Sequence, residues 1–125
     1  MRAILSGLHQ KKQKQELELE LIDVPGSFDN LRVTFLETTS LASITMPVTR
    51  IIDNNLVRVQ MDPAKLQFNA FDQSEFTWQL FLAFDANEEQ VILQVESEYL
   101  SDRHQLSLTS QFQFNADSAG MATLN

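Results

Sequence analysis

Apolar and polar residues alternate with a period of two along most of this chain, which is the pattern of β-strands that bury one face and expose the other. In residues 16–21 the alternation is complete, with glutamates at the even positions and leucines at the odd ones. Similar runs predict seven strands, at residues 15–22, 31–37, 43–51, 56–61, 76–84, 90–98 and 105–114. No stretch has the 3.6-residue period of an α-helix of ordinary length.

Turn-forming residues separate these runs. Pro25 and Gly26 follow the first run, residues 53–55 read Asp-Asn-Asn, and residues 85–89 form a polar cluster. Such residues accept the backbone angles of tight turns. They therefore predict one hairpin around the Asn-rich turn and a second around the polar cluster.

Short strands joined by turns are typical of sandwiches and barrels. We predict an all-β fold, an immunoglobulin-like two-sheet sandwich of about seven antiparallel strands. The chain should form a single domain, residues 1–125, in which residues 1–14 are a basic, solvated N-terminal segment and residues 115–125 fray. Trp78 belongs to the longest inward stripe, so we expect it to be buried with Leu80, Leu82, Val33, Val57, Leu93 and Leu108.

The composition excludes several kinds of site. The chain has 125 residues, no cysteine and three glycines. Without cysteine there is no disulfide, thiolate metal site or cysteine nucleophile. Three scattered glycines cannot build a phosphate-binding loop, and we expect neither a cofactor nor a bound metal.

Charge is divided unevenly along the chain. The net charge is −8, but residues 1–14 carry +4, whereas the remainder has five basic against 17 acidic residues, a net charge of −12. Because the chain after residue 14 is this acidic, it repels nucleic acid and other polyanions. No signal peptide or membrane-spanning run is visible in the sequence. We therefore expect a cytoplasmic protein whose basic segment could at most touch a membrane surface or a polymer.

Titratable residues offer candidate catalytic groups, each with a simpler structural interpretation. Asp102 and His104 could be the acid and the base of a catalytic pair, but they lie between two predicted strands, where an exposed turn is the simpler interpretation. His9 lies beside lysines and is expected to be solvated. Carboxylates two apart on a strand share a face about 7 Å apart, as in some glycosidases, but catalysis also needs a concave site and split pKa values. These pairs are Glu16/Glu18, Glu18/Glu20 and Glu96/Glu98, and Arg32 or Arg58 on neighbouring strands can offset their repulsion. We predict no catalytic residue.

Two further patterns suggest ligands. Oxygen-bearing residues alternate over residues 85–89, as in a calcium loop, but the glycine and distal glutamate of an EF-hand are missing, so a hairpin turn is expected. Aromatic side chains can stack on sugars; Trp78 faces inward, whereas Phe71 and Tyr99 lie at strand ends without forming a row.

Three apolar residues, Leu36, Phe81 and Ile92, lie on faces that the alternation would otherwise leave in water. Exposed apolar surface marks contact sites. One face of a domain this size can supply the roughly 800 Å² per partner that a stable interface needs. We therefore predict an association face at these residues, for a second copy or for a linked catalytic domain.

The order of the segments also resembles a known group of domains. The resemblance rests on the strand patterning of residues 16–22, 24–25, 28–33, 46–51, 56–62 and 78–84. These resemble the accessory β-sandwich modules of Gram-positive wall teichoic acid glycosyltransferases and of the CDP-glycerol glycerophosphotransferase family. The resemblance implies a non-catalytic module for self-association, for placing the enzyme or for contacting the polymer. The acidic body disfavours broad contact with a polyanionic polymer.

Three hypotheses follow. The first is an association module of a cell-wall polymer enzyme, the second a stand-alone carbohydrate-binding module, and the third a small hydrolase. An exposed apolar patch favours the first, an aromatic cluster in a groove the second, and a pocket with two carboxylates or His104 the third.

Overall fold

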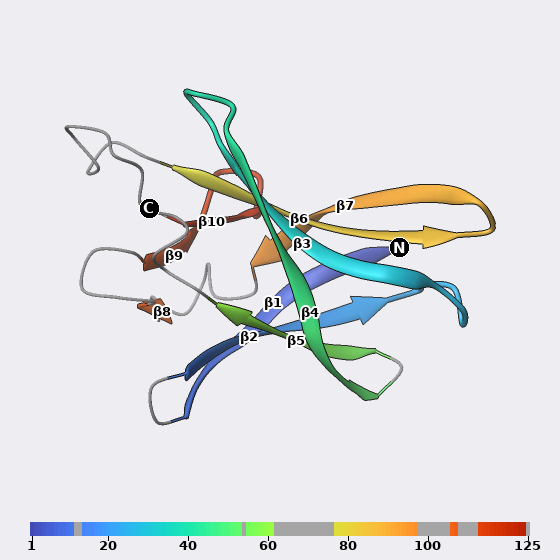
Figure 1. Ribbon diagram of the computed structural model, residues 1–125. Coiled ribbons are helices and arrows are strands. Elements are labelled where there is room, and N and C mark those ends of the chain that lie inside the picture. The colour runs from blue at the N-terminus through green and yellow to red at the C-terminus, as the bar shows by residue number, and fades with distance from the viewer. Residues whose placement is uncertain (12–13, 54, 62–76, 98–105, 108–112, 125) are drawn as a thin grey trace.

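A computed structural model describes residues 1–11, 14–53, 55–61, 77–97, 106–107 and 113–124, and all of its regular elements are strands (Figure 1). The ten strands are β1 (Arg2–Lys11), β2 (Lys14–Ile22), β3 (Asp29–Glu37), β4 (Ser43–Asp53), β5 (Leu56–Met61), β6 (Trp78–Ala86), β7 (Glu89–Ser97), β8 (Leu106–Ser107), β9 (Gln113–Ala116) and β10 (Ala122–Leu124). The all-β prediction is confirmed for the described residues. None of them lies in a helix that could span a membrane.

Seven of the strands are hydrogen-bonded in a closed ring, in the order β1–β2–β5–β4–β3–β6–β7 and back to β1. Neighbours are antiparallel except β7 and β1, which are parallel. Strands β8, β9 and β10 extend from β6 outside the ring.

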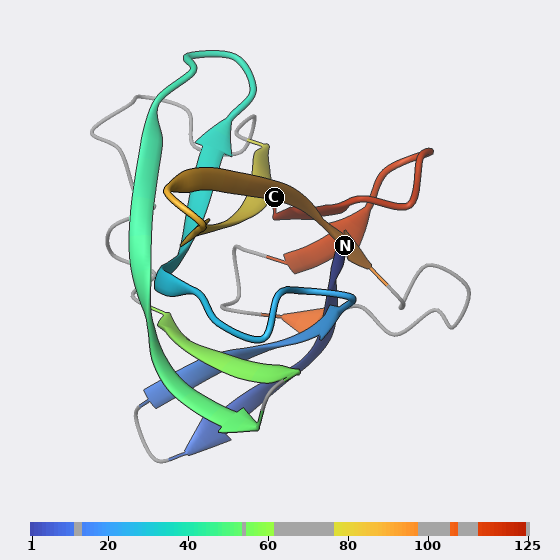
Figure 2. The ribbon, with the colours of Figure 1, turned by 90° about the vertical axis from the view of Figure 1, so that its right-hand side faces the viewer.

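Two long strands join the halves of the ring. The first half of β4 pairs with β3, and from Val48 onward β4 pairs with β5. Strand β7 likewise pairs first with β6 and then, from Val95, with β1. Figure 2 shows β4 crossing from the layer of β3 to that of β2 and β5. Pro47 lies at this crossing, where a residue without a backbone N–H is tolerated.

The immunoglobulin-like sandwich is not confirmed, because the β3–β4 and β7–β1 pairings close the two layers into one ring. The first six predicted strands are present with ends within two residues of those expected. The predicted strand 105–114 instead corresponds to β8 and part of β9, and residues 108–112 lie outside the described residues.

The prediction that residues 1–14 form a solvated connecting segment is wrong. Residues 2–11 form β1, and the side chains of Ala3, Ile4 and Leu5 are buried. The strand register shifts between Leu5 and Gly7, where β1 has a bulge. A bulge inserts a residue and so breaks the alternation that sequence analysis relies on.

The C-terminal residues also form ordered strands where fraying was predicted. The Asp117 carboxylate accepts hydrogen bonds from the N–H groups of Ala119 (2.9 Å) and Met121 (3.0 Å), and Gly120 has a φ of 85°. This turn returns the chain so that β10 pairs with β6, and all three β10 side chains are buried.

The core fills the ring with inward side chains from all seven strands. Trp78, Leu80 and Leu82 of β6 are fully buried in one cluster with Val33 and Val57, as predicted. Leu93 is half-buried against this cluster, and Leu108 lies outside the described residues.

Candidate functional site

The three residues predicted to form an association face line a single depression on the outside of β3, β6 and β7. Its volume is about 260 Å³. Strand register brings the residues together, because Thr34 of β3 lies opposite Phe81, and Ala83 of β6 lies opposite Ile92. The lining consists of Arg32, Thr34, Leu36, Phe81, Ala83, Gln90 and Ile92.

The depression is apolar at its centre. Ala83 is only 4% exposed, and its methyl group is the smallest side chain of the lining. Leu36 and Phe81 are half-buried, whereas Ile92 is 59% exposed. The short side chain at position 83 therefore leaves a hollow among larger apolar neighbours.

One side of the depression carries a cation. The Arg32 guanidinium donates a hydrogen bond of 2.7 Å to the Asn30 carbonyl oxygen and lies 3.9 Å from the Asp85 carboxylate. The Asn30 amide in turn donates to Asp85 at 3.3 Å. The sequence suggested that Arg32 could offset the repulsion between strand glutamates. Its position on β3, opposite Ala83 of β6, places it at the edge of the depression instead.

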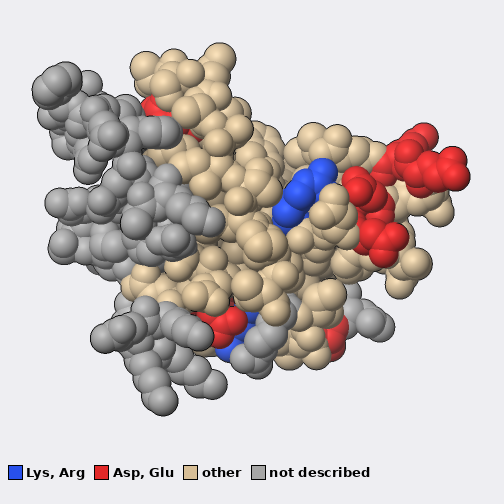
Figure 3. All heavy atoms as spheres, viewed as in Figure 1, with Lys and Arg blue, Asp and Glu red and all other residues tan. Residues whose placement is uncertain are grey.

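The charges around the depression are unevenly spread. Figure 3 shows acidic side chains gathered at one end of the molecule, over the tip of the β6–β7 hairpin, beside a broad area without charged groups. The hairpin tip contributes Asp85, Glu88 and Glu89. Asn87 and Glu88 both have positive φ and form the two-residue turn of the β6–β7 hairpin, within the polar cluster 85–89 where a hairpin turn was predicted.

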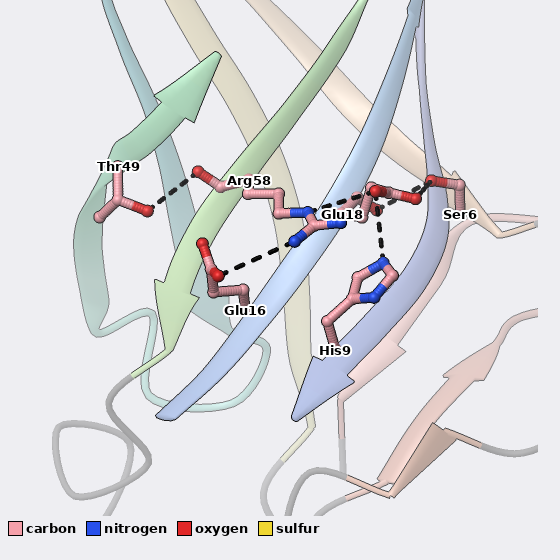
Figure 4. A network of polar contacts seen from close by, with 6 residues as sticks. All are labelled: Ser6, His9, Glu16, Glu18, Thr49 and Arg58. Carbon is pink, nitrogen blue, oxygen red and sulfur yellow. Dashed lines mark hydrogen bonds and ion pairs between the residues drawn. The ribbon is translucent and has the colours of Figure 1, made fainter. Parts of the chain in front are cut away.

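A second polar cluster lies on the outer face of β1, β2 and β5 (Figure 4). Glu18 is its centre. It lies 3.3 Å from the Arg58 Nε and 3.3 Å from the His9 Nε2, and it accepts a hydrogen bond of 3.2 Å from the Ser6 hydroxyl. Arg58 also lies 3.9 Å from Glu16, so one guanidinium faces both carboxylates, as the sequence suggested.

His9 was expected to be solvated among lysines. Its ring is partly exposed but faces Glu18 across the β1–β2 pair. Gly7 lies beside this imidazole, since a Cβ atom at its position would lie 3.4 Å from the His9 Nε2, an ordinary van der Waals distance. The cluster joins Arg58 of β5 to the carboxylates of β2 and links Glu18 to Ser6 and His9 of β1, which stabilises the packing of these strands modestly at a partly exposed surface.

The remaining sequence candidates do not meet in the described part of the chain. Trp78 is in the core and is not available for stacking on a sugar. Residues 71, 98, 99, 102 and 104 lie outside the described residues. Among the residues that are described, no group of three His, Asp or Glu side chains is placed to hold a metal ion.

These observations define an all-β domain with an apolar depression on one outer face. No family model matches the chain, and no curated protein matches it. Among solved structures it is similar to S. aureus TarS, with a TM-score of 0.69 and 14% identity over 98% of this chain and 24% of that one. It is also similar to the TarS fragment 217–571, with a TM-score of 0.61 and 13% identity over 98% of this chain and 37% of the fragment. The chain thus spans well under half of either TarS structure, and the likeness at this identity is one of fold.

Proposed function

We propose that this chain is a non-catalytic accessory module of a teichoic acid glycosyltransferase, and that it acts by self-association or by placing the enzyme. The observation that carries the proposal is the extent of the likeness: nearly the whole chain matches a minor part of TarS, a teichoic acid glycosyltransferase. A module of one larger enzyme is expected to have this relation to it. The strand patterning of the sequence independently supports the same group of domains.

The placement of the charged side chains supports a non-catalytic role. The carboxylates of Glu16 and Glu18 face the guanidinium of Arg58, and Glu96 is paired with Arg2. Catalytic acid–base pairs need carboxylates whose environments push their pKa values apart in a concave site. Paired carboxylates on the outer faces of strands suit a scaffold better.

The depression supports association as the mode of action. Leu36, Phe81 and Ile92 form an apolar centre on an outer sheet face, and exposed patches of this kind are used in protein contacts. The partner is a second copy or a linked catalytic domain, rather than a polyanion, because the chain carries a net charge of −8.

We also interpret the ring as a closed variant of the immunoglobulin-like sandwich. In that fold, strands A, B, E and D form one sheet and C, F and G the other. Here β1–β2–β5–β4 and β3–β6–β7 are the corresponding series in chain order. Hydrogen exchange tests this interpretation. Backbone amides that exchange faster at the β3–β4 and β7–β1 pairings than at the other pairings would support it, whereas equal protection around the ring would favour a single barrel.

Association is tested by sedimentation velocity over a wide range of protein concentration, with two isoleucine variants. Ile92→Ser changes the depression, whereas Ile51→Ser changes a similarly exposed isoleucine on β4 (61% against 59%) outside it. We expect the wild type and Ile51→Ser to associate with rising concentration and Ile92→Ser to stay monomeric. A wild type that is monomeric at all concentrations would refute self-association.

The non-catalytic role has its own assay. The protein is incubated with a nucleotide-sugar donor and a polyol-phosphate acceptor, and sugar transfer and donor hydrolysis are followed. We expect neither reaction. Turnover that disappears in Glu18→Gln or in a His104 variant would show that the chain is an enzyme.

A stand-alone carbohydrate-binding module is the second candidate. The observation in its favour is the polar lining beside the Phe81 ring, where Arg32, Thr34 and Gln90 offer groups that could bind hydroxyls. Glycan binding to the monomer that is lost in Phe81→Ala, without concentration-dependent association of the wild type, would favour this candidate.

A further inference from the structure

The turn between β3 and β4 presents an aliphatic side chain in an unusual way. Leu41 has a φ of 61° and is 69% exposed, more than any other large apolar residue of the described chain. The left-handed region is disfavoured for residues with a Cβ atom, and glycine, asparagine and aspartate tolerate it best. Asp23, Asn30 and Asn87, which also have positive φ, are of these tolerant types, and Glu88 in the β6–β7 turn is the other exception among the described residues.

The turn that carries Leu41 is held firmly from inside the ring. The buried Glu37 carboxylate accepts hydrogen bonds from the Thr39 N–H (2.8 Å), the Ser40 N–H (2.5 Å) and the Ser40 hydroxyl (2.8 Å). The Leu41 N–H donates to the Glu37 carbonyl oxygen at 3.0 Å, and the Glu37 N–H donates to Ala42 at 2.9 Å. Leu41 therefore projects from a turn whose backbone is fixed before any partner arrives.

Neither the strained backbone nor the exposure of Leu41 contributes to folding. Asparagine or glycine would fit the same turn at lower cost, and strain of this kind that persists points to a functional role. We propose that Leu41 inserts into the depression lined by Leu36, Phe81, Ala83 and Ile92 on a second copy of the chain. This inference rests on the self-association proposed above and names the residues that make the contact.

The depression matches this occupant in size and chemistry. Its volume of about 260 Å³ is below the roughly 300–1,000 Å³ of pockets for drug-sized ligands. It suits one side chain with part of its turn, and the small Ala83 leaves room at the floor.

Charge also favours a second copy at this site. Two chains of net charge −8 repel each other, so their contact should use surfaces free of acidic groups. Residues 38–42 read Thr-Thr-Ser-Leu-Ala and are uncharged. The only charged residue in the lining of the depression is the cation Arg32, which faces Asp85 just outside the lining.

Two variants test the two sides of the contact separately, the inserted Leu41 side chain and the depression that receives it. Leu41→Asn removes the aliphatic side chain and keeps a residue that tolerates positive φ. Ala83→Leu fills the depression from its floor on the outer face of β6, away from the core. Circular dichroism and thermal unfolding check that each variant folds, and Ile92→Ser replaces Ala83→Leu if the latter does not.

The experiment is sedimentation velocity on the wild type, on each variant and on an equimolar mixture of the two variants. We expect the wild type to associate and each variant alone to lose at least tenfold in association constant. The mixture should form a heterodimer, because Leu41→Asn keeps the depression and Ala83→Leu keeps the Leu41 side chain. A monomeric wild type would overturn both this inference and the self-association. Association of Leu41→Asn at wild-type strength, or a mixture that stays monomeric, would overturn this contact, and wild-type association would then still support the proposed function.

Discussion

Replacement of Glu37 tests how the β3–β4 turn is held. Glu37 faces inward on β3 opposite Trp78, and one carboxylate oxygen accepts three hydrogen bonds from Thr39 and Ser40. A hydrogen bond to a charged group contributes about 1.5–3 kcal/mol, roughly twice a neutral one. The donors lie in an exposed turn and can bind water once released, so the loss is smaller than the sum. We expect Glu37→Ala to lower the free energy of unfolding by about 2–4 kcal/mol and Glu37→Gln by about 1–2 kcal/mol at pH 7.

The pH dependence gives the sharper test. Burial raises the pKa of Glu37, but the hydrogen bonds from the Ser40 N–H, the Ser40 hydroxyl and the Thr39 N–H outweigh it and hold the pKa below its usual value. A carboxyl whose pKa is lowered on folding contributes stability above its unfolded pKa, and this contribution is lost as the pH falls through the folded pKa. The difference between wild type and Glu37→Gln should therefore shrink as the pH falls below the usual glutamate range.

The assay is urea unfolding followed by tryptophan fluorescence, at neutral pH and at several acidic values. Glu20→Gln is the matched control, because Glu20 lies on the outer face of β2 and its neutralisation removes one charge without touching the turn. We expect its effect to stay within about 0.5 kcal/mol at every pH, as is usual for a surface position. A Glu37→Gln difference that stays constant or grows on acidification would refute the reasoning, because it would mean that burial dominates the pKa.

Three further predictions concern single contacts. Trp78→Ala should cost about 3–5 kcal/mol in urea unfolding, because it empties the centre of the core; a loss below about 1 kcal/mol would mean that the ring repacks. Glu88→Gly should raise the free energy of unfolding by about 0.5–1 kcal/mol, because Glu88 has a φ of 65° in a turn that favours glycine; a lower melting temperature would contradict this. Arg2→Met should cost at most about 1 kcal/mol at neutral pH, since Arg2 forms a two-bond pair with Glu96 at a partly exposed site. The Arg2 hydrogen bonds lower the pKa of Glu96, so this cost should vanish as acid protonates the carboxyl, and a cost that persists in acid would point to lost packing instead.

The strands that sequence analysis located correctly are those in which the alternation is uninterrupted. Strand β2 is the clearest case, because its leucines are buried and its glutamates lie outside. Strand β1 was missed because the bulge between Leu5 and Gly7 changes which residues face inward, so that no single period describes it. Strand β10 was missed because three residues carry little pattern, and its place is fixed by pairing with Trp78 and Gln79, more than 40 residues earlier in the chain.

The candidate site was only partly predictable for the same reason. The alternation along the strands already places the apolar residues Leu36, Phe81 and Ile92 at outward positions. That they line one depression depends on the β3–β6 and β6–β7 registers, and register is a long-range property. The positive φ of Leu41 could not be predicted either, because the conformation of its turn depends on the hydrogen bonds to the buried Glu37 carboxylate.

Closure of the ring restricts how this chain can associate. Exposed strand edges are the usual route by which β-proteins pair with further strands. Here each of the seven ring strands has a neighbour on both sides over at least part of its length, and β6 pairs in addition with β10. Among the described residues, open edges remain at β8 and along the parts of β4 and β7 that pair on one side only; elsewhere, the self-association proposed above would use side chains on the outer faces or at the turns. The depression around Ala83 and the turn that carries Leu41 both present apolar side chains, and the acidic residue nearest to the depression, Asp85, is paired with Arg32 of its lining. The contact proposed between them would therefore bring few unpaired acidic groups together, which suits the association of a chain of net charge −8.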